Sequence, residues 1–414
     1  MAIIARRPDH DTKGLIVLTH KERATFGAPV MRGALEMMRD EYVILMHWGH
    51  HHSDVDDPWY VDAHLAGPTT ISFRTEDARH IPLCSRDFID PMFTDEPEEP
   101  KIWDVLCIAR PSKVKRMTDL LGAARAVFDQ GHRVKVLMLC ARPKDISDGD
   151  VWDHEFLNTW QEGFTASEKE DLELVLPVDD GTMFPYGALD IARLYRASRS
   201  FLLCSQREGE SRVIHEALLS GTPVLARRDL IGGGLDHLDE ANSQLYETVE
   251  ELASLMIGIK HQDPPVRVDV SEMRRRFGIE ASGERFNQAM RDLHRDLGLN
   301  DPAPFDVTGF ANLLPGHAQQ LPPHVRTGKT DDLFTLRGGL WFIEHALGRR
   351  VPGRRRVRGA HRMRWLQKVP GRCSMWAYRM KQRWTSPSSP AVSGVVLQID
   401  RRLAGGFDDA LGEE

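Results

Sequence analysis

The sequence predicts an α/β protein made of two lobes with parallel sheets, followed by a basic C-terminal extension. Short, continuous apolar runs alternate with segments of helical spacing, which is typical of buried parallel strands joined by helices. The acidic, proline-bearing stretch at 94–100 contains no apolar residue and predicts a linker between two such series. A strip rich in lysine and arginine follows the last clear helix.

The composition is that of an ordinary globular chain. Its 414 residues include 41% hydrophobic and 28% charged residues with a net charge of −7, which excludes a disordered or collagen-like protein. The apolar runs are far shorter than the ~20 residues that a membrane span requires, and none follows the N-terminus as a secretory signal would. The five cysteines are scattered and odd in number, which indicates reduced thiols. We therefore expect a cytoplasmic protein.

We expect the first lobe at 1–97 and the second at 98–298. In the first lobe, strands are predicted at 14–20 and 42–47 with a helix at 28–40 between them, and 68–74 predicts a third strand. The second lobe repeats the alternation more regularly, with strands predicted at 103–109, 132–140, 172–177, 200–204 and 222–226. Each is followed by a helical segment, so a doubly wound parallel sheet is favoured, and a last helix is expected at 274–297.

The third segment, 299–414, has a weaker pattern. Residues 332–347 are compatible with a helix although they carry two central glycines, and 349–383 contains thirteen Lys or Arg and no Asp or Glu. Cations interleaved with Trp365 and Trp376 suit an anionic membrane surface, so we expect residues 349–384 to contact the inner face of a membrane. Nucleic acid is the less favoured partner, and packing against the acidic body of the chain is the remaining alternative.

The stretch from Cys204 to Ala226 is the most informative for function. A predicted strand ends there, a loop at 205–209 follows, and a helix begins near residue 210. Ligands of open α/β sheets bind at this edge, and the free amides of a first helical turn attract phosphate. Gly209 lets a ligand approach the backbone closely. With a phosphate between Glu208 and Glu216, one carboxylate could reach a sugar hydroxyl and the other a ribose hydroxyl.

These residues carry a family resemblance. Glu208 and Glu216, followed by Ala217, Gly221 and Pro223, resemble the E-x7-E signature of retaining, GT-B-fold glycosyltransferases of the family-4 type. The run 108–115 is similar to the G-R-x4-K element of that family, and 80–93 resembles the stretch that crosses between its domains. The resemblance covers residues 80–297. It implies a GT-B-like fold of two Rossmann-like lobes facing a cleft, with the first lobe reduced.

The resemblance also implies roles for individual residues. Arg110 and Lys115 would neutralise the donor diphosphate without a metal, and Glu208 would hold hydroxyls of the transferred sugar. The remaining donor-binding residues would be Gly209, Glu210, Ser211 and Glu216. Each site residue also has a plainer interpretation: Glu216 as a solvated helix residue, Glu208 as a helix cap, and the two cations as part of a basic surface turn.

The activity implied is transfer of a sugar, with retention of anomeric configuration, from a UDP- or GDP-linked donor. The acceptor would be a glycan, a lipid-linked molecule or another hydroxyl compound, and no metal or other cofactor is expected. Two alternatives stay open: a protein that binds a nucleotide sugar without transferring it, and a transferase that modifies nucleic acid.

The first lobe is shorter than that of family members and lacks their glycine-rich first turn. Four histidines lie after its second predicted strand, His47 and those at 50–52, with aspartates close behind. Histidine and carboxylate suit transition metals, but adjacent histidines rarely converge on one ion, so an exposed polar loop is the favoured interpretation. On the acceptor side we select His47, at the strand end, as the candidate base for the acceptor hydroxyl.

Overall fold

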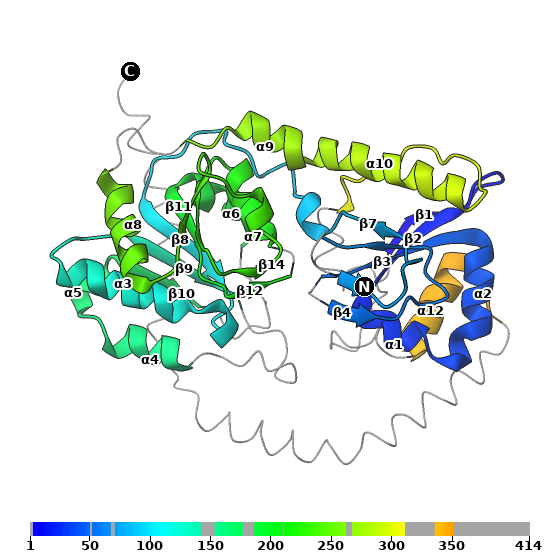
Figure 1. Ribbon diagram of the computed structural model, residues 1–414, viewed down its shortest axis with the longest axis horizontal. Coiled ribbons are helices and arrows are strands. Elements are labelled where there is room, and N and C mark those ends of the chain that lie inside the picture. Colours follow the sequence, from blue (N-terminus) through cyan, green and yellow to red (C-terminus); the bar gives the residue numbers. More distant parts are fainter. Residues whose placement is uncertain are drawn as a thin grey trace, which may run out of the picture. The chain divides into compact units, whose positions relative to one another are not determined.

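The computed structural model describes residues 3–49, 52–67, 71–141, 154–176, 186–209, 211–261, 267–310 and 336–351. Contacts divide the chain into two compact units (Figure 1). Unit 1 contains Met1–Phe88 together with the described residues from Ile279 onward, and unit 2 contains Ile89–Gly278. Each unit is built on a largely parallel sheet with helices on both faces, which confirms the predicted α/β fold class.

Unit 2 holds a six-stranded sheet in which all neighbours are parallel. Its strands are β8 (Trp103–Ala109), β9 (Val136–Cys140), β10 (Leu172–Val175), β11 (Ser198–Leu203), β13 (Val224–Arg227) and β15 (Ser243–Tyr246). They lie in the order β10-β9-β8-β11-β13-β15. This is the order of a dinucleotide-binding sheet, and the direction of winding reverses between β8 and β11.

Helices cover both faces of this sheet. One face packs on α3 (Met117–Asp129), α4 (His154–Glu162) and α8 (Val249–His261), and the other on α6 (Ala188–Arg196), α7 (Arg212–Leu219) and α9 (Val270–Phe277). The strands are mostly apolar because both of their faces are buried, and the charged Asp104 and Arg227 within them have ion-pair partners.

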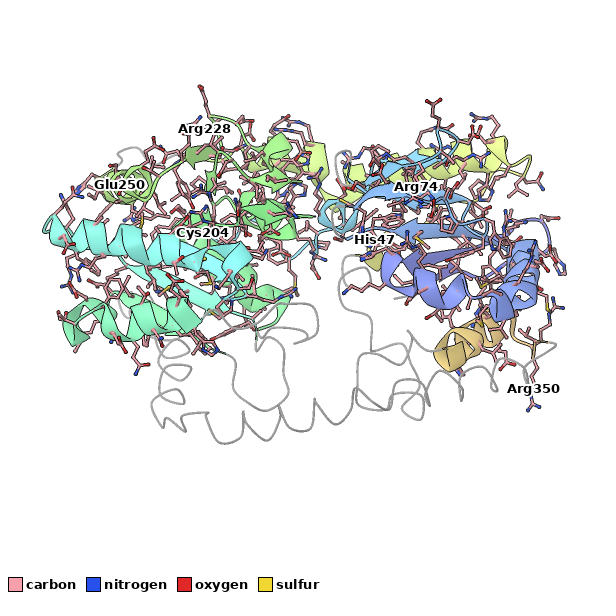
Figure 2. The ribbon with its side chains drawn as sticks, turned by 60° about the horizontal axis from the view of Figure 1, so that its bottom comes forward. His47, Arg74, Cys204, Arg228, Glu250 and Arg350 are labelled. Atoms are coloured by element: carbon pink, nitrogen blue, oxygen red, sulfur yellow. The ribbon has the colours of Figure 1, made fainter. Side chains whose placement is uncertain are left out.

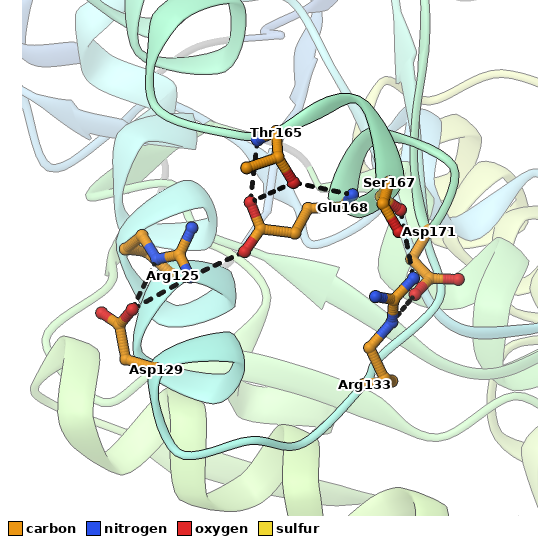
Figure 3. A network of polar contacts seen from close by, with 7 residues as sticks. All are labelled: Arg125, Asp129, Arg133, Thr165, Ser167, Glu168 and Asp171. Atoms are coloured by element: carbon orange, nitrogen blue, oxygen red, sulfur yellow. Dashed lines mark hydrogen bonds and ion pairs between the residues drawn. The ribbon is translucent and has the colours of Figure 1, made fainter.

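A polar network holds the short helix α5 (Ala166–Lys169) against α3 (Figure 3). Thr165 caps α5, and the Glu168 carboxylate accepts from the Thr165 backbone N–H at 2.8 Å. Arg125 reaches the same carboxylate at 2.8 Å and lowers the pKa of Glu168 to about 2. The network fixes the chain just before β10 and lies among residues of unit 2 only.

Unit 1 holds a five-stranded sheet in the order β1-β2-β3-β5-β7. Its strands are β1 (Ile3–Arg6), β2 (Gly14–Thr19), β3 (Tyr42–His47), β5 (Ala63–Leu65) and β7 (His80–Ile81). Strand β1 is antiparallel to β2, and the other neighbours are parallel. Strands β4 (His52–Val55) and β6 (Ile71–Phe73) form a separate parallel pair.

Segments from both ends of the sequence cover the unit 1 sheet. Helices α1 (Arg23–Phe26), α2 (Arg32–Glu41) and α12 (Leu336–Leu347) pack on one face, and α10 (Ile279–Asp296) packs on the other. A Cβ at Gly339 of α12 would lie 2.9 Å from the Thr25 Cγ2, so this glycine lets α12 approach α1 closely. Residues 1–88 supply the sheet and part of its cover, and α12 and α10 complete the cover on its two faces.

The structure corrects three expectations for the fold. The helix predicted at 274–297 is two helices, α9 and α10, separated at Gly278. Residues 279–298, predicted in the second lobe, belong with unit 1, and the first boundary lies at 88/89 rather than 97. The run 68–74 was expected to supply the third strand of the main sheet. Its described residues form β6, which pairs with β4 instead, and the short β5 is the third parallel strand.

Two further expectations concern thiols and membranes. Cys84, Cys107, Cys140 and Cys204 are free and buried, as predicted for reduced thiols (Cys204 is labelled in Figure 2). In the part of the chain that the structure describes, every helix is too short or too polar to cross a bilayer. The basic strip lies outside the described residues from position 352 onward.

Candidate functional site

The loops that follow β8 and β11 meet at the carboxyl edge of the unit 2 sheet. Arg110, half-buried, comes directly after β8, and Ser205 comes two residues after the end of β11. The Gln206 backbone N–H donates to the Val114 carbonyl at 3.1 Å, which ties the two loops together. Because the winding of the sheet reverses between these strands, this is where a doubly wound sheet binds its ligand.

An ion pair joins the same two loops. Lys115 ends a 3-10 turn (Lys113–Lys115), and Glu208 lies on the short strand β12 (Arg207–Glu208). The Lys115 Nζ is 2.5 Å from the Glu208 Oε1, and the two side chains are 25% and 12% exposed. The sequence placed both residues in one site, and the structure brings them into contact. Glu208 is therefore not the cap of the following helix, whose N-cap is Ser211.

A glycine-rich segment lies directly beside Glu208. Strand β14 (Ile231–Gly232) pairs in parallel with β12, and Gly232 has a φ of +101°. A Cβ at Gly232 would lie 1.8 Å from the Glu208 carbonyl oxygen, so only glycine fits there. The Gly233 backbone N–H donates to the Gly209 carbonyl at 3.3 Å. The loop after β13 thus fixes the backbone of the loop that carries Glu208.

Two buried serines belong to this edge. Ser211 precedes the first residue of α7 and is 3% exposed, and Ser205 is 1% exposed. The side-chain oxygens of both have no hydrogen-bond partner among the described residues. Ser211 was selected from the sequence, whereas Ser205 was missed, although a hydroxyl just after a buried strand was the available signal. Glu210 lies outside the described residues.

Glu216 lies on α7 and has a different partner from Glu208. The Arg212 Nε is 3.4 Å from the Glu216 Oε1, and the Glu216 side chain is 13% exposed. Burial raises the pKa of Glu216 above its ordinary value, with the nearby Asp90 carboxylate adding to the rise, although Arg212 and Tyr195 act in the opposite direction. Glu216 is not a solvated helix residue.

A third arginine is committed to carboxylates. Arg227, at the end of β13, contacts Asp119 at 2.8 Å and Asp229 at 2.7 Å, and its side chain is 7% exposed. Lys115 and Arg110 are more exposed than this buried guanidinium. Lys115 and Arg110, the two cations selected from the sequence, are therefore better placed than Arg227 to meet an anionic ligand.

The acceptor-side candidate, His47, lies in unit 1 at the end of β3 (labelled in Figure 2). It is 4% exposed, and its Nε2 accepts a hydrogen bond from the Ser85 backbone N–H at 3.2 Å. A neutral imidazole that accepts at one nitrogen carries its hydrogen on the other. Nε2 of His47 is therefore occupied, and burial keeps the ring from a ligand.

No metal-binding group is found among the described residues: three or more His, Cys, Asp or Glu never gather as ligands there. The histidines at positions 50 and 51, which the sequence placed beside His47, lie outside the described residues. His47 is buried at the end of β3 and His52 begins the strand β4, so the expected exposed loop is wrong for these two histidines.

Comparison with known proteins concerns the fold. No protein-family model and no curated protein matches the sequence. Among solved structures, the chain is similar to TarM, with 14% identity over 66% of this chain and 54% of TarM and a TM-score of 0.46. It is also similar to sucrose-phosphate synthase from Thermosynechococcus elongatus (16% identity, 68% of this chain and 74% of that one, TM-score 0.44).

A further similar structure is that of Anabaena HepE in complex with UDP, with 15% identity over 67% of this chain and 78% of HepE and a TM-score of 0.47. The chain resembles GT-B glycosyltransferases. It spans about half the length of TarM, at 54%. At 14–16% identity, this likeness concerns the course of the backbone and not the residues of the site.

Proposed function

We propose that the protein is a glycosyltransferase that moves a sugar from a nucleotide-sugar donor to a hydroxyl acceptor, with retention of anomeric configuration. The observation that carries the proposal is the Lys115–Glu208 pair, at 2.5 Å, where the winding of the unit 2 sheet reverses. A cation for a diphosphate and a carboxylate for sugar hydroxyls stand side by side there. The family resemblance of the motifs around them supports the same activity.

The pair has chemistry suited to a nucleotide sugar. A lysine ammonium has three N–H donors, so Lys115 can keep its bond to Glu208 and still donate to a phosphate oxygen. Arg110 would add a second cation, and the two serine hydroxyls and the start of α7 would supply donors. The carboxylate of Glu216 would accept from ribose hydroxyls.

In the proposed reaction, the bond from the anomeric carbon to the acceptor oxygen forms on the face from which the diphosphate departs. The bond from that carbon to the diphosphate oxygen breaks, and the acceptor proton passes to the departing phosphate. Lys115 and Arg110 would offset the negative charge that grows on the leaving group, an effect typically strong in a partly dehydrated site. No protein nucleophile is required.

The proposal is tested by removing the carboxylate next to the cation. Glu208→Ala should abolish transfer from UDP-glucose, UDP-N-acetylglucosamine or GDP-mannose, whichever the wild type uses, and leave the melting temperature near that of the wild type. Glu250→Ala, an exposed carboxylate on α8, is the matched control and should transfer normally (Figure 2). Unchanged turnover in Glu208→Ala, or no calorimetric binding of any donor to the wild type, would refute the assignment.

The membrane contact belongs to the same proposal. Residues 349–384 would hold the enzyme at an anionic surface when the acceptor is lipid-linked, because their cations attract acidic headgroups. Flotation with phosphatidylglycerol vesicles should carry the protein upward, and pure phosphatidylcholine vesicles should not. Equal flotation with both would contradict an electrostatic contact.

A further inference from the structure

Aromatic and imidazole rings gather at the carboxyl edge of the unit 1 sheet. His20 directly follows β2, Trp48 directly follows β3, and His64 lies within β5. These three strands are neighbours and parallel, so their carboxyl ends lie at one edge. The unit 1 sheet has no reversal of winding like that of unit 2, so it is the ring cluster itself that makes this edge a place to look for a second ligand.

A directed chain of hydrogen bonds fixes the indole at this edge. The Trp48 Nε1–H donates to the His64 Nδ1 at 3.0 Å, and the His64 Nε2 lies 2.9 Å from the Asp57 Oδ1. An indole nitrogen only donates, so His64 must accept at Nδ1 and carry its hydrogen on Nε2, where it donates to Asp57. Trp48 and His64 are each 1% exposed. The chain runs from a buried indole to a carboxylate that is 32% exposed.

The fixed indole supports two further imidazoles. The His20 ring is stacked on Trp48, with centroids 5.7 Å apart and planes 12° apart. The His52 ring meets Trp48 edge-on at 5.1 Å and lies 4.9 Å from His20. Both histidines are half-buried, unlike Trp48 and His64. Asp57 and His64 thus support the cluster through Trp48. His20 and His52 are partly exposed, although the His52 Nε2 is buried.

The tautomer of His20 is also set by its surroundings. The Gly49 backbone N–H donates to the His20 Nδ1 at 3.4 Å, so the neutral ring carries its hydrogen on Nε2. Such a ring donates to a hydroxyl oxygen rather than removing its proton. This agrees with a reaction in which the acceptor proton passes to the departing phosphate.

We propose that His20 and His52 form a hydroxyl-binding subsite for a saccharide acceptor, with Asp57, His64 and Trp48 as its positioning residues. The inference rests on the proposed function and replaces His47 as the acceptor-side residue. Imidazole N–H groups bind neutral hydroxyls, and ring faces pack against the C–H face of a sugar. A diphosphate needs the fixed cations that Lys115 and Arg110 supply in unit 2.

The test compares transfer with acceptor-independent hydrolysis of the donor, using methyl glycosides of glucose, galactose and mannose as the acceptor probes. The double variant His20→Ala/His52→Ala should lower kcat/KM for the methyl glycoside by about tenfold or more, as expected from losing two hydrogen bonds to a bound hydroxyl. Calorimetric affinity for the nucleotide sugar and its rate of hydrolysis should stay at wild-type values. His10→Ala, an exposed histidine in the same unit, is the control.

The positioning role is tested by Trp48→Phe, which keeps one aromatic ring and removes the N–H that binds His64 together with part of the buried indole. It should raise KM for the methyl glycoside about three- to fivefold with little change in kcat, and saturation-transfer NMR should show weaker contact with the glycoside. Equal KM in Trp48→Phe and wild type would overturn the positioning role.

The outcomes separate the inference from the proposed function. Wild-type transfer to methyl glycosides that is unchanged in the double variant would overturn the subsite and leave the glycosyltransferase assignment intact. Donor hydrolysis without transfer to any of the three glycosides would overturn a saccharide subsite. Failure of the wild type to bind a nucleotide sugar would instead end the proposed function.

Discussion

The carboxyl edges of the two sheets differ in chemistry although the sheets share a parallel design. In unit 2 the edge carries Lys115 and Glu208 in direct contact, with Arg110 beside them in sequence after β8. In unit 1 it carries an indole and imidazoles joined through Trp48 and His64, with the Arg23 guanidinium 5.6 Å from the centre of the indole ring. Only the unit 2 sheet reverses its winding, since β2, β3, β5 and β7 of unit 1 follow one another in chain order. In both units the side chains at the edge decide what binds there. Fixed charges suit a diphosphate, whereas neutral rings suit hydroxyls.

The sharpest way to break this comparison is to remove the charge from unit 2. Lys115→Ala should lower transfer about 10²–10³-fold, because the cation that offsets the departing diphosphate is lost. Steady-state kinetics with the nucleotide sugar measures the effect. Lys113→Ala, an exposed lysine in the same 3-10 turn, is the matched control and should stay near wild type. Equal losses in the two variants would mean that only the general positive charge of the turn matters.

Truncating a buried isoleucine of α12 tests whether the stability of unit 1 depends on this helix. Ile343 is 0% exposed in the core of unit 1, so Ile343→Ala should cost about 2–5 kcal/mol of unfolding free energy. Urea denaturation followed by tryptophan fluorescence measures the loss. Arg350→Ala, on the exposed side after the helix, should change little. A small loss in Ile343→Ala would show that α12 is not an integral part of the unit.

A pH dependence should distinguish unit 1. Burial lowers the pKa of His64, with His80 adding to the drop and Asp57 opposing it. The unfolded chain therefore takes up the proton first, so stability from His64 is complete above its unfolded pKa of about 6.5 and is lost as the pH falls below that value, by at most about 1.4 kcal/mol per pH unit. The melting-temperature advantage of wild type over His64→Gln should shrink between pH 7 and 5. An advantage that grows on acidification would contradict the neutral ring.

The opposite slope is expected in unit 2, and it is the smallest effect. Burial raises the pKa of Glu216, so the folded state holds its proton longer than the unfolded chain, and stability is lost as the pH rises above about 4.5. Without donor, Glu216→Gln should gain in melting temperature relative to wild type between pH 4.5 and 7, while donor affinity falls. A relative loss over that range would show that the Arg212 contact outweighs burial.

Most of the unit 2 fold was predictable because its strands are buried on both faces and leave continuous apolar runs. Trp103–Ala109 matches the predicted strand residue for residue. Unit 1 was harder, since β5 has only three residues, one of which is the buried His64. The packing of α10 on unit 1 could not be predicted either, because the sequence of an amphipathic helix does not show which sheet its apolar face packs against.

The candidate site was predictable only where charge and motif coincided. Lys115 and Glu208 are 93 residues apart, and only the motif order placed them together. For Ser205 and His20 the only signal is a single hydroxyl or imidazole after a strand, which is too common to select a residue. These residues become candidates only when the structure shows that the strand ends lie together at one edge of the sheet.

The way α12 fills the unit 1 core has a consequence for synthesis on the ribosome. The described part of unit 2 ends at Gly278, whereas the first 88 residues must wait for α10 and α12 before their sheet is covered on both faces. We therefore expect the usual order, in which the N-terminal domain folds first during translation, to be reversed in this chain. The nascent β2 and β3 stay partly uncovered while more than two hundred further residues are added, so this is the stage at which a chaperone has most to protect.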